Sequence, residues 1–66
     1  MVINSQKLML TMARREMRAA DVVEETGLSR SVVSAIIHGK KCKPVTLGKI
    51  ARALGVEPEQ LVDMEG

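Results

Sequence analysis

The sequence predicts an all-α domain made of five short helices. Apolar residues recur at three- and four-residue spacings along most of the chain, and no stretch alternates with period two for long enough to indicate a strand. Serine, glycine or proline stands where these periodic stretches begin or end. Because 66 residues leave room for one modest core, we expect a single domain over residues 1–66, folded as a helical bundle with short loops.

Local signals define the ends of the expected helices. Asn4 or Ser5 can cap the first helix and Ser29 the third, because their side-chain oxygens accept hydrogen bonds from the free N–H groups of a first turn. Gly27 can end the second helix, since glycine adopts the left-handed conformation without a steric penalty. Pro58 suits the first turn of a last helix. The five helices are therefore expected at about residues 5–15, 19–26, 30–38, 45–54 and 58–64.

The third expected helix has an apolar side and a slim side. At roughly 100° per residue, the apolar side holds Val32, Val33, Ile36 and Ile37, and the slim side holds Arg30, Ser31, Ser34, Ala35 and His38. A slim helix fits the major groove of DNA, which is about 12 Å wide, and brings its first turn to the base edges. Arg30 can reach the O6 and N7 atoms of guanine, while Ser31 and Ser34 can donate or accept hydrogen bonds. Ala35 is small enough to contact a thymine methyl group.

Charge and composition favour duplex nucleic acid as the partner. Residues 1–43 contain eight Lys and Arg against four Asp and Glu, whereas the remainder contains two basic and four acidic residues. A basic half is an expected feature of a protein that binds a polyanion. Aromatic residues are absent, so stacking on the bases of single-stranded nucleic acid is not available.

The cysteine content and the apolar runs exclude other classes of protein. Cys42 is the single cysteine, so the chain can form neither an internal disulfide nor a multi-cysteine zinc site. A lone thiol suits a reducing, cytoplasmic compartment, and no run resembles a signal peptide or a membrane span. We expect no metal, no cofactor and no enzymatic activity, because no catalytic motif is recognisable around His38 or elsewhere.

Two runs of the sequence resemble one family. The run VVEETGLSRSVVSAIIHGKK is similar to the helix-turn-helix of the phage repressor and Cro family, also called the XRE or lambda-repressor-like family. The run KPVTLGKIARALGVEPEQLV resembles the fourth and fifth helices of that family, so the likeness extends from about Ile3 to Val62. The resemblance implies a five-helix domain that binds operator DNA as a two-fold homodimer, with the third helix in the major groove.

The resemblance also implies roles for individual residues. By position, the base-reading residues fall on Arg30, Ser31 and Ala35, with Val32 and Ser34 beside them. The phosphate contacts fall on Arg18, Ala19, His38, Lys40, Lys41 and Lys43. Alternatives remain for these residues: Arg30 and the lysines could be solvated surface residues, and His38 could simply end its helix beside the C-terminal dipole.

Two departures from the family pattern affect the expected contacts. Ala19 stands where many members have a phosphate-binding glutamine, so that contact would rely on the N–H groups of the helix N-terminus. Met12 and Ile37 stand where many members have an arginine paired with a glutamate. A joint replacement of a buried ion pair by two apolar residues is often neutral or stabilising, which supports the alignment.

These features predict a sequence-specific regulator of transcription, of the repressor type. The alternative is a protein-interaction module such as an antitoxin or anti-repressor. Met9, Leu10, Met12 and Ala13 together make the first helix more apolar all round than one buried face requires. The residues expected at a dimer contact could equally seal the core of one protomer. They are Val56, Leu61, Val62 and Met64.

Overall fold

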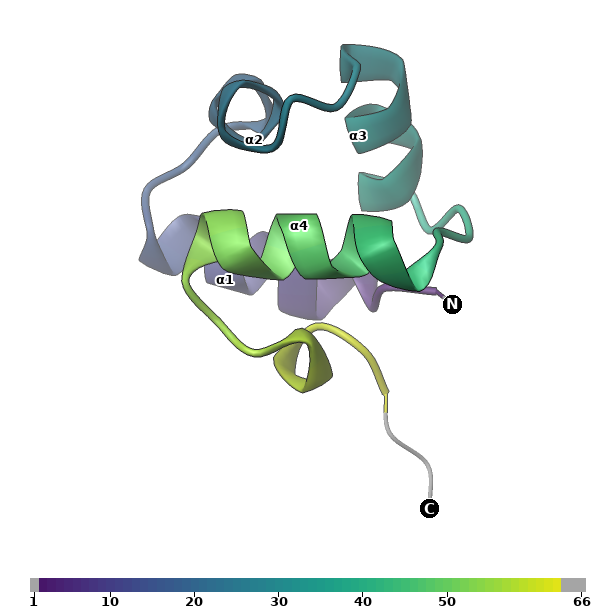
Figure 1. Ribbon diagram of the computed structural model, residues 1–66. Coiled ribbons are helices and arrows are strands. Elements are labelled where there is room, and N and C mark those ends of the chain that lie inside the picture. Colours follow the sequence, from purple (N-terminus) through teal and green to yellow (C-terminus); the bar gives the residue numbers. More distant parts are fainter. Residues whose placement is uncertain (1, 64–66) are drawn as a thin grey trace.

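The computed structural model describes residues 2–63 as four α-helices followed by a 3-10 turn (Figure 1). The all-α class is thereby confirmed. In this part of the chain, β pairing is limited to an isolated antiparallel bridge between Val2 and Lys41. The elements are α1 (Ser5–Arg14), α2 (Ala19–Thr26), α3 (Arg30–Ile37), α4 (Pro44–Leu54) and the turn η1 (Pro58–Gln60).

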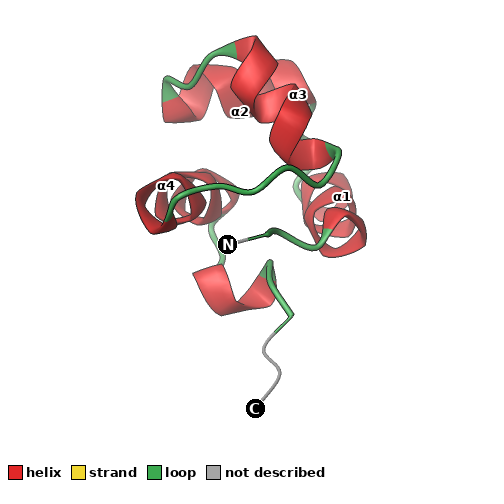
Figure 2. Cartoon of the chain, turned by 90° about the vertical axis from the view of Figure 1, so that its right-hand side faces the viewer, coloured by secondary structure: helices red, strands yellow, loops and turns green. Residues whose placement is uncertain are grey.

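The helices form two layers around one core. Helices α1 and α4 lie side by side, α2 and α3 cover them from one side, and η1 closes the opposite side (Figure 2). Helix α2 packs on both α3 and α4, and α3 also contacts α1. The core residues are Ile3, Leu8, Val22, Val33, Ile36, Leu47, Ile50, Ala51, Leu54, Leu61 and Val62.

Capping groups fix the ends of the helices. The Asn4 side-chain oxygen accepts a hydrogen bond from the Lys7 backbone N–H at 3.0 Å, so Asn4 rather than Ser5 caps α1. The Ser29 hydroxyl oxygen accepts one from the Val32 N–H at 3.2 Å and caps α3. Gly27, with a φ of 73°, ends α2 in the left-handed conformation that favours glycine. Residues 27–29 therefore define the turn between α2 and α3, because Gly27 ends one helix and Ser29 begins the next.

The apolar pair expected on α1 and α3 lies against the core. Met12 and Ile37 are both partly buried and pack on it. Apolar side chains at these two positions need no charged partner, in keeping with the joint departure from the family pattern.

The expected fifth helix at 58–64 is wrong for the residues that the structure describes. Pro58–Gln60 form a single 3-10 turn, and the Leu61 N–H donates to the Pro58 carbonyl oxygen at 3.0 Å instead of continuing an α-helix. Residues 64–66 lie outside the described part. Tertiary contacts hold the residues after this turn. Leu61 and Val62 are buried in the core, the Leu61 carbonyl oxygen accepts from the Asn4 N–H at 2.8 Å and the Val62 carbonyl oxygen accepts from Lys7 Nζ at 3.2 Å.

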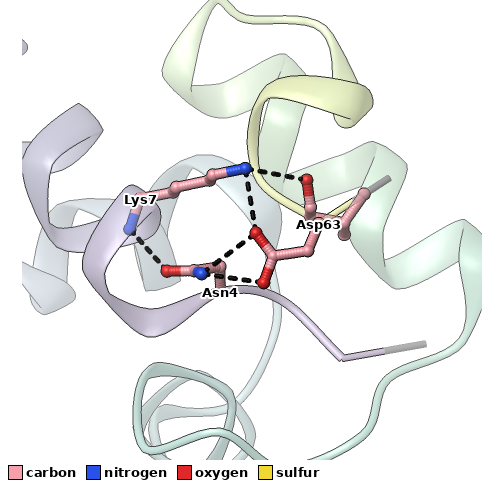
Figure 3. Close-up of polar contacts among 4 residues, drawn as sticks. Asn4, Lys7 and Asp63 are labelled. Carbon is pink, nitrogen blue, oxygen red and sulfur yellow. Dashed lines mark hydrogen bonds and ion pairs between the residues drawn. The ribbon is translucent and has the colours of Figure 1, made fainter. Parts of the chain in front are cut away.

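Side chains from both ends of the described chain complete this contact, which we call the terminal clasp of Asn4, Lys7 and Asp63 (Figure 3). The Asn4 amide nitrogen donates to both Asp63 carboxylate oxygens, at 3.0 and 3.2 Å. Lys7 Nζ pairs with Asp63 Oδ1 at 3.0 Å. The Asn4 amide and then the Lys7 ammonium hold the pKa of Asp63 below its usual value.

The described helices include none with the length and hydropathy needed to cross a membrane.

Candidate nucleic-acid interface

A groove of about 430 Å³ lies between the outer side of α3 and the loop that joins α3 to α4. Its wall on the α3 side includes Ser31, Val32 and Ala35, which are three of the five predicted base-reading residues. All three predicted loop lysines stand on the other side. The full lining is Leu28, Ser31, Val32, Ala35, Ile36, Lys40, Lys41, Cys42, Lys43 and Thr46.

Packing sets the rotation of α3 about its axis. Val33 and Ile36 are each 2% exposed and anchor the helix on the core. Residues on the outer side are consequently turned to solvent: Ser31 and Val32 are exposed and Ala35 is half-buried. Arg30 and Ser34 are exposed too, but they lie outside the groove lining, on the other flank of the helix. The five predicted base-reading residues are therefore divided between two flanks of α3.

The structure corrects the prediction that Val32 belongs to the buried apolar side of α3. Its position suggested burial beside Val33, yet it is 42% exposed. The reason is that the neighbouring loop and the start of α4 leave a groove beside this flank of the helix, so that no element covers Val32. The base-reading position that the family resemblance gave to Val32 is compatible with this exposure.

The loop lysines supply positive charge that no carboxylate in residues 2–63 neutralises. Lys40, Lys41 and Lys43 are exposed, and the ion pairs among those residues involve other cations. Lys41 is held by its β-bridge with Val2, a contact between the N-terminal segment and the loop for which the sequence carried no local signal. An anionic chain along the groove would find three available ammonium groups.

Arg18 and Ala19 meet at the N-terminus of α2. The Arg18 backbone N–H donates to Asp21 Oδ2 at 2.7 Å, and the Arg18 guanidinium Nε lies 3.5 Å from the same atom. These bonds, the backbone one first, hold the pKa of the Asp21 carboxyl below its usual value. The Arg18 side chain is 83% exposed and can reach a phosphate. A phosphate beside Ala19 would share the helix terminus with the Asp21 carboxylate, which weakens that predicted contact.

His38 caps the C-terminus of α3. Its Nδ1 atom lies 2.7 Å from the Ser34 carbonyl oxygen. Because a carbonyl oxygen can only accept, Nδ1 carries the hydrogen and donates it. The ring is exposed, so the other nitrogen remains the atom with which His38 would contact a phosphate.

The residues predicted at the dimer contact fall mainly in the core of the protomer. Leu61 is 0% exposed and Val62 is 6% exposed, so sealing the core is the alternative that the structure shows for both. Val56 is partly buried and packs on the core. Met64 lies outside the described residues. Among the three described residues, Val56 retains the most surface and lines a groove of about 310 Å³ together with Leu10, Arg14 and Gln60.

A second surface feature is the outer side of α1. Met9 is 51% exposed and Leu10 is 61% exposed, which makes them two adjacent large apolar residues in contact with solvent. The sequence identified this excess of apolar residues, and the structure places it away from the groove of α3.

The described residues contain no group of three or more His, Cys, Asp or Glu side chains placed to hold a metal ion.

Comparison with known protein families gives one match over nearly the whole chain. The model of the Cro/C1-type HTH DNA-binding domain family matches residues 7–66. No curated protein matches the chain significantly.

Solved structures of PhpD and of hydroxyethylphosphonate dioxygenase contain a similar domain. PhpD with cadmium, complexed with hydroethylphosphonate, is 29% identical with a TM-score of 0.81, and a variant of hydroxyethylphosphonate dioxygenase is 29% identical with a TM-score of 0.83. In both cases the similarity covers 100% of this chain but 14% of the enzyme chain. The chain thus spans about a seventh of the length of these enzymes, and their activity is not transferred to it.

Proposed function

We propose that this chain, which belongs to the Cro/C1-type helix-turn-helix DNA-binding family, is a sequence-specific regulator that represses transcription by occupying an operator in duplex DNA. The observation that carries the proposal is the groove of α3. Three predicted base-reading residues and three lysines line it together.

The two walls of this groove suit the two components of a DNA contact. Backbone phosphates fix the position of a protein on the duplex and contribute no sequence information, whereas base edges determine the sequence choice. In our proposal Lys40, Lys41 and Lys43 contact phosphates while Ser31 and Ala35 face the bases. Arg30 and Ser34, on the other flank of α3, extend the reading to neighbouring base pairs, and Arg18 and His38 contact phosphate at the margins.

A homodimer is part of the proposal. An eight-residue helix reads a few base pairs, so a repressor gains specificity when two copies bind two half-sites about one helical turn, roughly 34 Å, apart. Analytical ultracentrifugation with and without a two-half-site duplex measures the stoichiometry. Two protomers per duplex support the dimer, and a single protomer contradicts it.

Selection from a random duplex pool tests the reading of sequence. We expect enrichment of a motif with two-fold symmetry, bound about a hundredfold more tightly than scrambled duplex at physiological salt, or about 3 kcal/mol. Arg30→Ala should remove most of this preference. Arg14→Ala, which removes an exposed arginine from α1, is the matched control and should preserve it. Failure to enrich any motif would contradict the proposal.

A salt series tests the phosphate contacts. Replacing Lys40, Lys41 and Lys43 together by glutamine should weaken binding to all duplexes and reduce the slope of log K against log salt by about 2 to 3. Lys49→Gln changes an exposed lysine on α4 that does not line the groove. An equal effect of the two changes would show that the loop has no special role.

The exposed residues of α1 favour a second candidate function, a protein-interaction module of the antitoxin or anti-repressor type. Met9 and Leu10 offer apolar surface, and Arg14 borders the adjacent groove. A suitable partner would therefore present an apolar patch beside a carboxylate. Co-purification with products of neighbouring genes distinguishes the candidates: Leu10→Ser should abolish such a complex and Arg30→Ala should preserve it.

A further inference from the structure

The N-terminal segment of the chain lies beside the loop that joins α3 to α4 (Figure 1). Within this contact, Val2 forms an isolated antiparallel bridge with Lys41. Residues that stand directly opposite each other in an antiparallel pair carry their side chains on the same side, with Cβ atoms about 4.5–5.5 Å apart. The side chains of Val2 and Lys41 are therefore immediate neighbours.

Burial of the adjacent residues shows which way these two side chains point. Successive side chains of extended backbone point to opposite sides. Ile3, next to Val2, is 1% exposed and belongs to the core. Cys42, next to Lys41, is partly buried and packs against the same core. Val2 and Lys41 consequently both point outward, and Val2 is 48% exposed.

Backbone hydrogen bonds hold both partners of the bridge in place. The Asn4 N–H donates to the Leu61 carbonyl oxygen at 2.8 Å, which fixes the end of the N-terminal segment. The Lys40 N–H donates to the Ala35 carbonyl oxygen at 3.0 Å, which fixes the start of the loop on α3. Neither strand of the bridge can then move without breaking contacts to the rest of the domain.

The position of Val2 limits the directions that the Lys41 side chain can take. Lys41 lines the groove of α3 and Val2 does not, so Val2 flanks the lysine on the side away from the groove. A β-branched side chain is stiff, and beside it the lysine stem loses the rotamers that would turn the ammonium group away from the groove. An ammonium group already directed into the groove loses less freedom when it binds a phosphate.

We propose that Val2 is a positioning residue for the DNA contact: it directs the Lys41 ammonium group into the groove and makes Lys41 the strongest phosphate contact of the three loop lysines. The bridge involves neither Lys40 nor Lys43. The inference rests on the proposed function, because it requires the loop lysines to contact phosphates. It goes further by giving the N-terminal segment a role in binding.

Binding of the full-length protein to a labelled duplex of scrambled sequence tests the inference, because phosphate contacts do not depend on sequence. Val2→Ser removes the branched side chain and should lower the affinity about threefold, the cost of ordering one long side chain. Val2→Thr keeps a branched Cβ and should bind as the wild type does. Val45→Ser is the matched control, because Val45 is a 69% exposed valine on α4 outside the groove lining.

A double-mutant cycle distinguishes positioning of Lys41 from a general structural effect. The weakening caused by Val2→Ser should disappear in a Lys41→Gln protein and persist in full in a Lys40→Gln protein. A loosened fold would instead weaken binding equally in both backgrounds. Lys41→Gln alone should also weaken binding more than Lys40→Gln does. Circular dichroism verifies that every variant is folded at the temperature of the measurement.

A charge placed at the same position gives an independent readout. Val2→Glu sets a carboxylate directly opposite Lys41, where it pairs with the ammonium group. The slope of log K against log salt should then fall by about 1, as expected when one phosphate contact is lost. Val45→Glu adds the same charge away from the groove and should change the slope less.

The outcomes separate this inference from the proposed function. If Val2→Ser binds as tightly as the wild type, or if its weakening persists in Lys41→Gln, the inference is overturned and the phosphate contacts of the loop stand. If replacing Lys40, Lys41 and Lys43 together by glutamine leaves the affinity unchanged, both the inference and the proposed role of the loop are overturned.

Discussion

Gly48 inside α4 and Gly55 at its C-terminal cap should respond in opposite ways to the same substitution. Gly48 lies inside the helix, and a Cβ atom added there would meet no atom within 4 Å beyond its chain neighbours and the nearby backbone of α4 itself. Glycine in a helix interior costs about 1 kcal/mol relative to alanine, because its unfolded backbone is freer. Gly48→Ala should therefore raise the free energy of unfolding by about 1 kcal/mol and the melting temperature by about 4–8 °C.

Gly55 provides the matched control at the end of the same helix. It has a φ of 70°, a conformation that costs a residue with a Cβ about 1–2 kcal/mol. The nearest atoms to an added Cβ belong to the Arg15 guanidinium group, at 3.6 Å, which is ordinary contact. The backbone conformation alone should then make Gly55→Ala destabilising, by about 1 kcal/mol or more.

Urea and thermal denaturation followed by circular dichroism measure both changes. Shifts of the same sign, or a Gly48→Ala protein less stable than the wild type, would refute the reasoning. DNA binding should be measured on the same proteins. A stabilised Gly48→Ala protein that binds DNA more weakly would show that the open space beside Gly48 is occupied in the complex.

Three further predictions concern the core and the terminal clasp. Leu54 is 0% exposed, so Leu54→Ala should lower the free energy of unfolding by about 2–5 kcal/mol. Circular dichroism should then show that much of so small a protein is unfolded. Leu10→Ala, at an exposed position, should lower the free energy of unfolding by less than about 0.5 kcal/mol. Asn4→Ala should lower the free energy of unfolding, measured by urea denaturation, by about 1 kcal/mol through loss of the α1 cap. Asn4→Ser keeps a capping oxygen and should restore most of that stability. If Asn4→Ser is as unstable as Asn4→Ala, the hydrogen bonds of the clasp contribute more than the cap. Because folding lowers the pKa of Asp63, the associated stability is present above its unfolded pKa of about 3.9 and is lost as the pH falls through the folded value. Asp63→Asn should remove that part of the acid-side loss in melting curves recorded below about pH 5, and an unchanged pH profile would contradict the assignment.

Much of the fold could be predicted because its determinants are local. The caps at Asn4 and Ser29 and the left-handed turn at Gly27 depend on residues within three or four positions of each other. These interactions define α1, α2 and α3 before any tertiary contact is known. The Cro/C1-type family assignment then follows from the order of the motifs.

The errors have tertiary causes. The expected last helix is replaced by a 3-10 turn, after which Leu61 and Val62 are held by burial in the core and by hydrogen bonds from Asn4 and Lys7 to their carbonyl oxygens. Val32 lies at the edge of the apolar side of α3, where neighbouring elements decide whether it is covered. Sequence periodicity does not contain that information, since it describes one helix at a time.

The candidate site shows the same division. The sequence identified Ser31, Ala35 and the lysines as separate groups, and their presence in one groove became visible only with the path of the α3–α4 loop. The bridge that links Lys41 to Val2 joins residues far apart in the sequence, and no local pattern indicates it. The DNA-contact roles of these residues stay predictions.

The terminal clasp gives the chain the topology of a nearly closed ring. Asn4 and Asp63 are separated by 59 positions in sequence and are joined by hydrogen bonds at 3.0 and 3.2 Å. A short peptide linker between the two ends could then replace the clasp, and new termini could open in an exposed connection such as the turn at Gly55. Such a circular permutant would retain α2, the turn and α3 as an uninterrupted unit, so the order in which the helices are connected can be varied while the groove of α3 is kept.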